Sequence, residues 1–585
     1  MRDVMFGLGL QYDTGVNTSV AINASGMVVE VHKAELGNRL WYHVGTIDRN
    51  TVAWGASHDY DNGITPSVAL NNNRIAVEVH ETESPFSNRL YCHVGTVNAE
   101  SHSITWGPSR DYDDGKVPHV AVNSSGVVVE VHETNSPFDS KMWYHVGHIS
   151  GDGVVWGPSH DYDTGKTPRV AINSSGLVIE VHEGGKHLWY HVGRLNGDRI
   201  DWGPSRYYQS GVQPSVGLTD DGLVIETHKS ETFATLWSLV GQVNGDTINW
   251  SNASNFDDGV APSTATNGTW AVQTHQSENF PTLWFSTSLV IDRSNWMGER
   301  FDVLKNKTLR QIAIPGTHDA GMYTGNILGR TQDQNLYLQL SGGVRYFDLR
   351  PDKNMNIVHG PVNGPPVQEV LNDVNKFMSE GHHELAILKF SHYDGFDDTV
   401  YRTLVQMIKD TLGPWLFITS PTTRLAQLSL QEIMGSGPDA SAEPSGKLLV
   451  LCDGDYPVDI PTRGIYVYRD WESPDPQKGN LTVYDQYSNT INYEQMKQDQ
   501  LAKFEAFDGK CKYNPAVPCD LFLLSWTLTP PTDVWDASKA ANRQLGAVMS
   551  GVNRNRNGFI TNIIYVDYYE YSRVTDVAVT VNCRW

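Results

Sequence analysis

Two histidines and an arginine in the second half of this 585-residue chain are the residue types that phosphodiester cleavage requires. His318 lies in a GTHDAG segment, Arg350 in FDLRPD and His359 in VHG. One histidine can take the proton of an attacking hydroxyl, the other can protonate the leaving alkoxide, and a guanidinium can compensate charge on the phosphoryl oxygens. Histidine suits both roles because its pKa is close to neutrality. The pattern therefore predicts an acid–base site for phosphodiester chemistry.

Three aspartates accompany these residues. Asp319 follows the first histidine, Asp348 precedes the arginine by two positions, and Asp567 ends the last candidate strand. A carboxylate that accepts a hydrogen bond from a catalytic histidine fixes its tautomer and stabilises the imidazolium, and we expect Asp567 in that role. A single histidine on a strand is more often a satisfied core residue, so the prediction depends on the whole set occurring together.

The elements that would position these residues form an α/β barrel. Beyond Trp296, β-rich runs alternate with amphipathic helical runs, the pattern of a TIM-type barrel, and we expect a distorted barrel over residues 297–585. Catalytic side chains in such barrels follow the carboxyl ends of the strands. The expected strands are 311–314, 344–350, 385–390, 448–452, 465–468, 481–485, 521–526 and 563–567, with helices at 367–378, 399–412, 494–507 and 537–552.

The motifs HD, DLR and VHG, in this order, resemble the X-region of phosphatidylinositol-specific phospholipases C, and the resemblance extends from about Arg300 to Trp585. In that family the inositol 2-hydroxyl attacks the phosphate and releases diacylglycerol and a cyclic inositol phosphate. The resemblance implies that His318 is the general base and His359 the general acid. It also implies that Arg350 and Asp319 bind phosphate and support this pair, with Asp348 beside them.

The resemblance extends to substrate binding. In the YDQY segment it implies that Asp485 holds inositol hydroxyls and that Tyr487 stacks on the ring. Metal-independent bacterial members carry an arginine where this chain has Cys452-Asp453, so inositol recognition differs there. Calcium-dependent relatives tend to carry an acidic residue in place of Arg350, and a guanidinium can supply the metal's charge. We therefore expect no essential metal and no cofactor. The ELAILKFSH segment at 384–392 resembles the strand that follows in eukaryotic-like members, and no role is assigned to it.

The first 290 residues contain a different pattern, an internal repeat of about fifty residues. Each copy holds four short β-patterned runs separated by turn residues, which is the content of one propeller blade. The N-terminal YDTG segment matches a late segment of the other repeats, so we expect a six-bladed β-propeller over residues 1–290 that is closed by its N-terminal strand. These repeats resemble those of propeller lectins. The repeated Glu-Val-His motif and its variants begin at Glu30, Glu78, Glu130, Glu180, Glu226 and Gln273.

Three features of the repeats have a structural and a functional interpretation. The Glu and His side chains either form metal or sugar sites or hydrogen-bond between blades, and we favour the bonds. The regularly spaced tryptophans form either blade core or sugar platforms, and we favour core. The Asp-Tyr-Asp segments resemble calcium loops but lack the terminal bidentate glutamate, so we interpret them as turns.

Composition limits the partners. A net charge of −23 argues against non-specific binding to nucleic acid or to an anionic membrane, since both require clustered Lys and Arg. No apolar run is long enough to span a membrane, and the N-terminus lacks the apolar stretch of a secretory signal, so the expected protein is soluble. Its localisation stays open, with secretion by a non-classical route and action at a membrane surface as the alternatives. Of five cysteines, only Cys511 and Cys519 are spaced to close a small loop.

Two functions from different classes fit these observations. The first is a phosphodiesterase (a phosphorus–oxygen lyase) that cleaves phosphatidylinositol or a glycosylated inositol lipid anchor, with the propeller binding surface glycans. The second is a lectin-like protein whose barrel binds inositol lipid headgroups without turnover. A glycerophosphodiesterase or sphingomyelinase D is weaker, because the acidic metal-binding cluster of those enzymes is not evident after the first strands.

Overall fold

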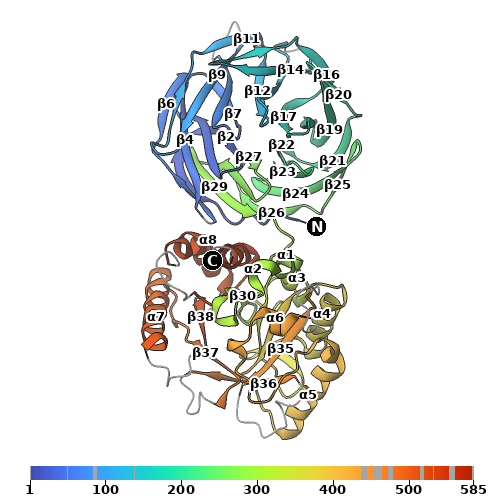
Figure 1. Cartoon of the computed structure of the whole chain (residues 1–585), viewed down its shortest axis with the longest axis vertical. Helices are drawn as coiled ribbons and strands as arrows, with labels where there is room; N and C mark the ends of the chain where they lie inside the picture. Colours follow the sequence, from blue (N-terminus) through green and yellow to red (C-terminus); the bar gives the residue numbers. More distant parts are fainter. Residues whose placement is uncertain are drawn as a thin grey trace. The chain divides into compact units, whose positions relative to one another are not determined.

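The computed structural model describes residues 2–48, 50–82, 88–136, 139–435, 444–453, 464–471, 478–513, 520–530, 533–552 and 560–582. The chain divides into two compact units. One comprises Asp3–Val290, and the other comprises Ile291–Trp585 together with Met1–Arg2 (Figure 1). Cys511 and Cys519 lie outside the residues whose side chains are described.

The first unit is a six-bladed β-propeller, as the repeats predict (Figure 1). In the first blade β2 (Val16–Ile22), β3 (Met27–Lys33) and β4 (Arg39–Asp48) pair in order, and both β5 (Thr51–Trp54) and β6 (His58–Asn62) pair with β4. The next four blades repeat this plan. Their strands are β7 (Ile64–Leu70), β8 (Ile75–Glu81), β9 (Arg89–Asn98), β10 (Ser103–Trp106), β11 (Arg110–Asp114); β12 (Lys116–Val122), β13 (Val127–Glu133), β14 (Lys141–Ser150), β15 (Gly153–Trp156), β16 (His160–Thr164); β17 (Lys166–Ile172), β18 (Leu177–Gly184), β19 (His187–Asn196), β20 (Arg199–Trp202), β21 (Arg206–Ser210); β22 (Val212–Leu218), β23 (Leu223–Lys229), β24 (Thr235–Asn244), β25 (Thr247–Trp250) and β26 (Ser254–Asp258).

The last blade is built from both ends of the propeller sequence. Strands β27 (Val260–Thr266), β28 (Trp270–Gln276) and β29 (Thr282–Leu289) are completed by β1 (Leu10–Thr14), which pairs antiparallel with β29. At five blade junctions a tyrosine stacks on a tryptophan, for example Tyr60 on Trp106 with ring centroids 5.3 Å apart. At the sixth junction Phe6 takes the place of the tryptophan and packs on Phe256 at 5.3 Å. The tryptophans therefore belong to the packing between blades.

The Asp-Tyr-Asp segments are strands, so their interpretation as turns was wrong. They form β6, β11 and β16, each paired with the outer part of a long strand through a bulge. The alternation of aspartate and tyrosine is the two-residue period of a strand, and it places the tyrosine ring against the next blade. Tyr60, for example, donates a hydrogen bond to Glu78 Oε1 of the next blade at 2.8 Å.

The Glu and His side chains of the repeated motif mainly form hydrogen bonds and His–carboxylate contacts within and between blades, as we expected. Glu78 is fully buried and its second oxygen lies 3.1 Å from His80 Nδ1. His80 Nε2 is in turn 3.7 Å from Asp61 of the preceding blade, and the same carboxylate is 2.6 Å from His93 Nε2. At this junction the buried side chains of Glu78 and His80 are thus satisfied by neighbours in the same blade and in the preceding one.

The second unit is a closed barrel of eight parallel strands, which confirms the predicted fold class. Its order is β30-β31-β34-β35-β36-β37-β38-β39, and β30 closes the ring by pairing with β39. The strands are β30 (Ile314–Thr317), β31 (Tyr346–Leu349), β34 (Leu385–Phe390), β35 (Lys447–Asp453), β36 (Ile465–Asp470), β37 (Leu481–Asp485), β38 (Leu521–Trp526) and β39 (Ile563–Val566), and a separate hairpin holds β32 (Asn356–His359) and β33 (Val362–Pro366). The helices are α1 (Trp296–Glu299), α2 (Phe301–Leu304), α3 (Leu336–Ser341), α4 (Val367–Ser379), α5 (Asp398–Leu412), α6 (Leu430–Met434), α7 (Tyr493–Tyr513), α8 (Val534–Val552) and α9 (Val574–Asn582).

The first barrel strand begins later than predicted. Residues 309–311 form a 3-10 turn in which the side chains of Thr308 and Gln311 make a capping box, so the strand begins at Ile314. His318, the first residue of the predicted site, still follows the strand directly. No helix in the described parts of the chain is both long enough and apolar enough to cross a membrane.

Candidate active site

The carboxyl ends of the barrel strands bring the predicted site residues together. His318 follows β30, Arg350 follows β31, Asp485 ends β37 and Asp567 follows β39. Together with His359, the last residue of β32, they line a cavity of about 510 Å³. Such an edge is where side chains from different parallel strands meet.

His318 lies between two buried carboxylates. Its Nδ1 donates a hydrogen bond to Asp567 Oδ1 at 2.8 Å, and its Nε2 is 3.4 Å from Asp319 Oδ2. Burial alone would lower the pKa of His318, but the charges of Asp319 and Asp567 raise it to about 9. The bond to Asp567 fixes the ring so that Nε2 is the nitrogen available for proton transfer.

Arg350 lies between the other two acidic residues. Its Nε is 2.6 Å from Asp319 Oδ1 and 2.9 Å from Asp348 Oδ2. Both carboxylates are fully buried, whereas Arg350 lines the cavity, so the two aspartates contact the guanidinium on its buried side. The backbone of Asp319 has a φ of 42°, a conformation that is uncommon outside glycine and that often marks functional sites. Neither Asp319 nor Asp348 is among the residues that line the cavity, so we interpret both as residues that position other groups, including Asp319, for which the resemblance implied a phosphate contact.

His359 is the more exposed histidine, with a third of its side chain accessible. Its Nδ1 donates to Gly329 O at 3.1 Å, which leaves Nε2 for proton exchange. The rings of His318 and His359 are 6.4 Å apart between centroids. Two histidines at this separation can serve the attacking and the leaving oxygen of one phosphodiester.

On the other side of the cavity Asp485 has a partner that the sequence did not identify. Lys389, in the buried strand β34, donates from Nζ to Asp485 Oδ2 at 2.9 Å and is 3.6 Å from Asp348 Oδ1. Tyr468 donates to the same Asp485 oxygen at 2.8 Å. Although burial opposes it, the positive charge of Lys389 lowers the pKa of Asp485, which keeps the carboxylate ionised. Tyr487 lines the same cavity and is 61% exposed.

One signal in the sequence could have identified Lys389. It is a charged residue within the apolar strand segment LAILKF, and a buried amine is rare unless it is paired. Tyr565 also escaped prediction, although its hydroxyl donates to Asp348 Oδ2 at 2.7 Å from the interior face of β39.

The chain is similar to known proteins over part of its length. No family model matches it. The 1-phosphatidylinositol phosphodiesterase of Listeria monocytogenes is 32% identical over 144 residues, which cover 23% of this chain and 43% of that protein. The PI-PLC X domain-containing protein 3 of Bos taurus is 29% identical over 156 residues, which cover 20% of this chain and 48% of that protein. The chain resembles the PI-PLC X-domain proteins.

The chain thus spans slightly less than half the length of these X-domain relatives. Among solved structures, the phosphatidylinositol-specific phospholipase C of Listeria monocytogenes is similar with a TM-score of 0.35 and 19% identity, covering 49% of this chain and 99% of that one.

The PI-PLC-like site also contains residues of the kind that bind metals. His318, Asp319 and Asp348 each offer a ligand atom, and these atoms lie within 4.8 Å of one another. However, Arg350 lies between the two carboxylates and already compensates their charge. Because a cation at this position would have to displace the guanidinium, the donor set fits a metal poorly.

Proposed function

We propose that the barrel is a phosphatidylinositol-specific phospholipase C-type phosphodiesterase that needs no metal. One observation carries the proposal: His318, His359 and Arg350 line one cavity, with each histidine held through Nδ1 so that its Nε2 is available. The partial sequence similarity to a phosphatidylinositol phosphodiesterase supports the same chemistry.

In the proposed reaction the inositol 2-hydroxyl attacks the phosphorus. His318 takes the hydroxyl proton, the bond between phosphorus and the glycerol oxygen breaks, and His359 donates a proton to that oxygen. Diacylglycerol and a cyclic inositol phosphate are the products. Arg350 compensates the charge that develops on the phosphoryl oxygens, and Asp567 stabilises the imidazolium of His318. Asp319 and Asp348 hold Arg350 in place.

Asp485 and Tyr487 are the proposed substrate-binding residues. An ionised carboxylate accepts hydrogen bonds from inositol hydroxyls, and an exposed phenol ring offers a face to the sugar ring. We extend the proposed substrates to glycosylated inositol lipid anchors, and we propose that the propeller brings the barrel to glycan-bearing surfaces. Several weak sites on one propeller would raise the avidity for such a surface.

The separate roles of the two histidines can be tested with leaving groups of different basicity. An inositol phosphodiester with a nitrophenol leaving group needs no protonation, so His359→Ala should lose little activity on it while losing about 100-fold or more on phosphatidylinositol. His318→Ala should be impaired on both substrates, because the attack still needs a base. If both variants lose activity equally on both substrates, the assigned roles are wrong.

A second candidate is a binding protein that holds inositol lipid headgroups without turnover. It predicts that wild type binds phosphatidylinositol vesicles but releases no diacylglycerol, and that His318→Ala leaves this binding unchanged. Measuring binding and product release on the same vesicles separates the two candidates.

A further inference from the structure

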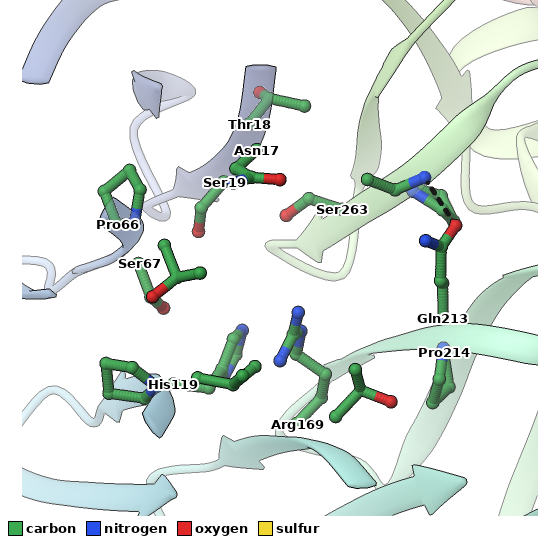
Figure 2. A pocket seen from close by; sticks show the side chains of 16 residues that line it. Asn17, Thr18, Ser19, Pro66, Ser67, His119, Arg169, Gln213, Pro214 and Ser263 are labelled. Carbon is green, nitrogen blue, oxygen red and sulfur yellow. Dashed lines mark hydrogen bonds between the residues drawn. The ribbon is translucent and has the colours of Figure 1, made fainter. Parts of the chain in front are cut away.

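The propeller contains a second cavity, of about 200 Å³, at which all six innermost strands meet (Figure 2). The six repeats place equivalent residues around it, one from each innermost strand. Four of these positions hold serine, whereas one holds histidine and one holds arginine. The six are Ser19, Ser67, His119, Arg169, Ser215 and Ser263, and all but Ser215 line the cavity.

The serine hydroxyls at this cavity already accept hydrogen bonds from the backbone. Ser67 Oγ accepts from Val120 N of the next blade at 3.2 Å, and Ser19 Oγ accepts from Val68 N at 3.2 Å. Ser263 Oγ accepts in the same way from Val20 N at 3.1 Å. None of these three hydroxyls donates to another group in the described parts of the chain. Each therefore has a proton left to donate to a ligand.

His119 offers a further donor. Its Nδ1 accepts from Val170 N at 3.2 Å, so in the neutral ring the proton is on Nε2. Burial and, second, the charge of Arg169 keep the pKa of His119 well below its usual value, so the ring is neutral. In Figure 2 its side chain and that of Arg169 extend into the cavity.

Arg169 breaks the serine pattern with a positive charge that has no acidic partner. Its Nη1 donates to Pro168 O at 2.9 Å, and no carboxylate in the described parts of the chain lies within ion-pair distance of it. The nearby Glu133 and Glu183 instead accept from the backbone N–H groups of Thr167 and Gln213, both at 2.7 Å. Burial lowers the pKa of Arg169 to about 10, so the guanidinium still carries its charge at neutral pH.

The cavity wall is also held in an unusual backbone conformation. The residue two positions before each of the six ring positions has a positive φ, for example Thr65 at 49° and Val117 at 50°. Branched residues rarely adopt this conformation, and the surrounding structure has to impose it. The ring is therefore preorganised, which favours a binding site over a flexible channel.

We propose that this cavity binds an oxyanion, the carboxylate or phosphate group of a small ligand, with Arg169 as the charged contact and His119 and the serine hydroxyls as neutral donors. Arg169 and His119 offer N–H groups, and Ser19, Ser67 and Ser263 each have a hydroxyl proton to donate, which suits an anionic group. The proposal concerns the propeller alone and does not depend on activity in the barrel.

The test is isothermal titration calorimetry of the full chain with inorganic phosphate, glucuronate and glucose. We expect binding of phosphate or glucuronate, or of both, and none of glucose, and the comparison of the two acids identifies the preferred group. Arg169→Ser installs the residue that four of the six blades carry, so it should fold, and it should weaken binding at least about tenfold. Arg194→Ser removes an exposed charge from the same blade and should leave the affinity unchanged.

Two further variants keep the result interpretable. Because phosphate can also bind near Arg350, the titrations are repeated with Arg350→Ala, which should leave the propeller signal intact. Anion binding that survives in Arg169→Ser but disappears in Arg350→Ala would overturn the proposal, as would a wild type that binds neither acid. Equal binding of glucose and glucuronate would also overturn it.

Discussion

At the scale of single residues, the properties of the site depend on which of three buried carboxylates contact His318 and which contact Arg350. Asp567 and Asp319 lie on the two nitrogens of His318, whereas Asp319 and Asp348 share Arg350. This arrangement makes His318 a stronger base than an ordinary histidine, but it also keeps the ring protonated at neutral pH. The pH dependence of the reaction follows from this balance.

On the nitrophenyl substrate, whose leaving group needs no proton from His359, we expect kcat/KM to rise about tenfold per pH unit through neutrality and to level off near the pKa of His318, which is about 9. Replacing Asp567 by Asn removes a charge that stabilises the imidazolium, so the pKa should fall and the rising limb should move to lower pH. Asp453→Asn removes a charge from the cavity without touching His318, so it is the control and should move the limb less. A limb unchanged in Asp567→Asn would contradict this assignment.

Lys389→Met tests the partner of Asp485. Without the lysine, Asp485 loses a hydrogen bond to a charged group, worth about 1.5–3 kcal/mol, so KM should rise roughly 10- to 100-fold with a smaller change in kcat. Lys376→Met, on the exposed face of α4, should change neither value. If kcat falls while KM stays constant, Lys389 does not act through substrate binding.

At the scale of elements, a fully buried ion pair connects parts of the barrel unit at the amino-terminal ends of two barrel strands. Arg345 Nε donates to Glu384 Oε2 at 2.7 Å, and Glu384 Oε1 accepts from the backbone N–H groups of Met297 and Gly298. The pair joins the segments that lead into β31 and β34 to α1. Removing one partner leaves an uncompensated buried charge.

Glu384→Ala should therefore destabilise the barrel by about 3–5 kcal/mol. Calorimetry of the full chain should show the unfolding transition of the barrel unit at a lower temperature and that of the propeller unchanged. Glu380→Ala, at an exposed position at the end of α4, should stay within about 0.5 kcal/mol of wild type. Equal stability of the two variants would mean that the pair contributes nothing to the barrel.

The elements also show what the sequence could and could not predict. The apolar strands 385–390, 481–485 and 521–526 coincide with β34, β37 and β38, because short apolar runs between helices have few alternatives. The Asp-Tyr-Asp strands were misjudged because aspartate is rare in strands, and only pairing with a long neighbour makes them extended. The charge of Lys389 within an apolar strand indicates a buried partner, but nothing local in the sequence identifies that partner as Asp485, 96 residues away, because only the folded barrel brings the two together.

At the scale of the whole molecule, the propeller depends on a strand from its beginning to complete its last blade. Deleting residues 3–14 should expose the edge of β29, and exposed edges recruit other chains. We expect the deletion variant to form oligomers in size-exclusion chromatography, while Phe6→Trp, which restores the residue of the other repeats, should stay in the wild-type state. A deletion variant that elutes like wild type would show that β1 is dispensable for closure.

The most direct test of the central claim is the release of diacylglycerol and cyclic inositol phosphate from phosphatidylinositol vesicles, with and without a chelator, by wild type and by His318→Ala. The account predicts turnover that is unaffected by the chelator and is abolished by the substitution. Loss of wild-type turnover in the chelator, or turnover that persists in His318→Ala, would contradict the metal-free acid–base mechanism.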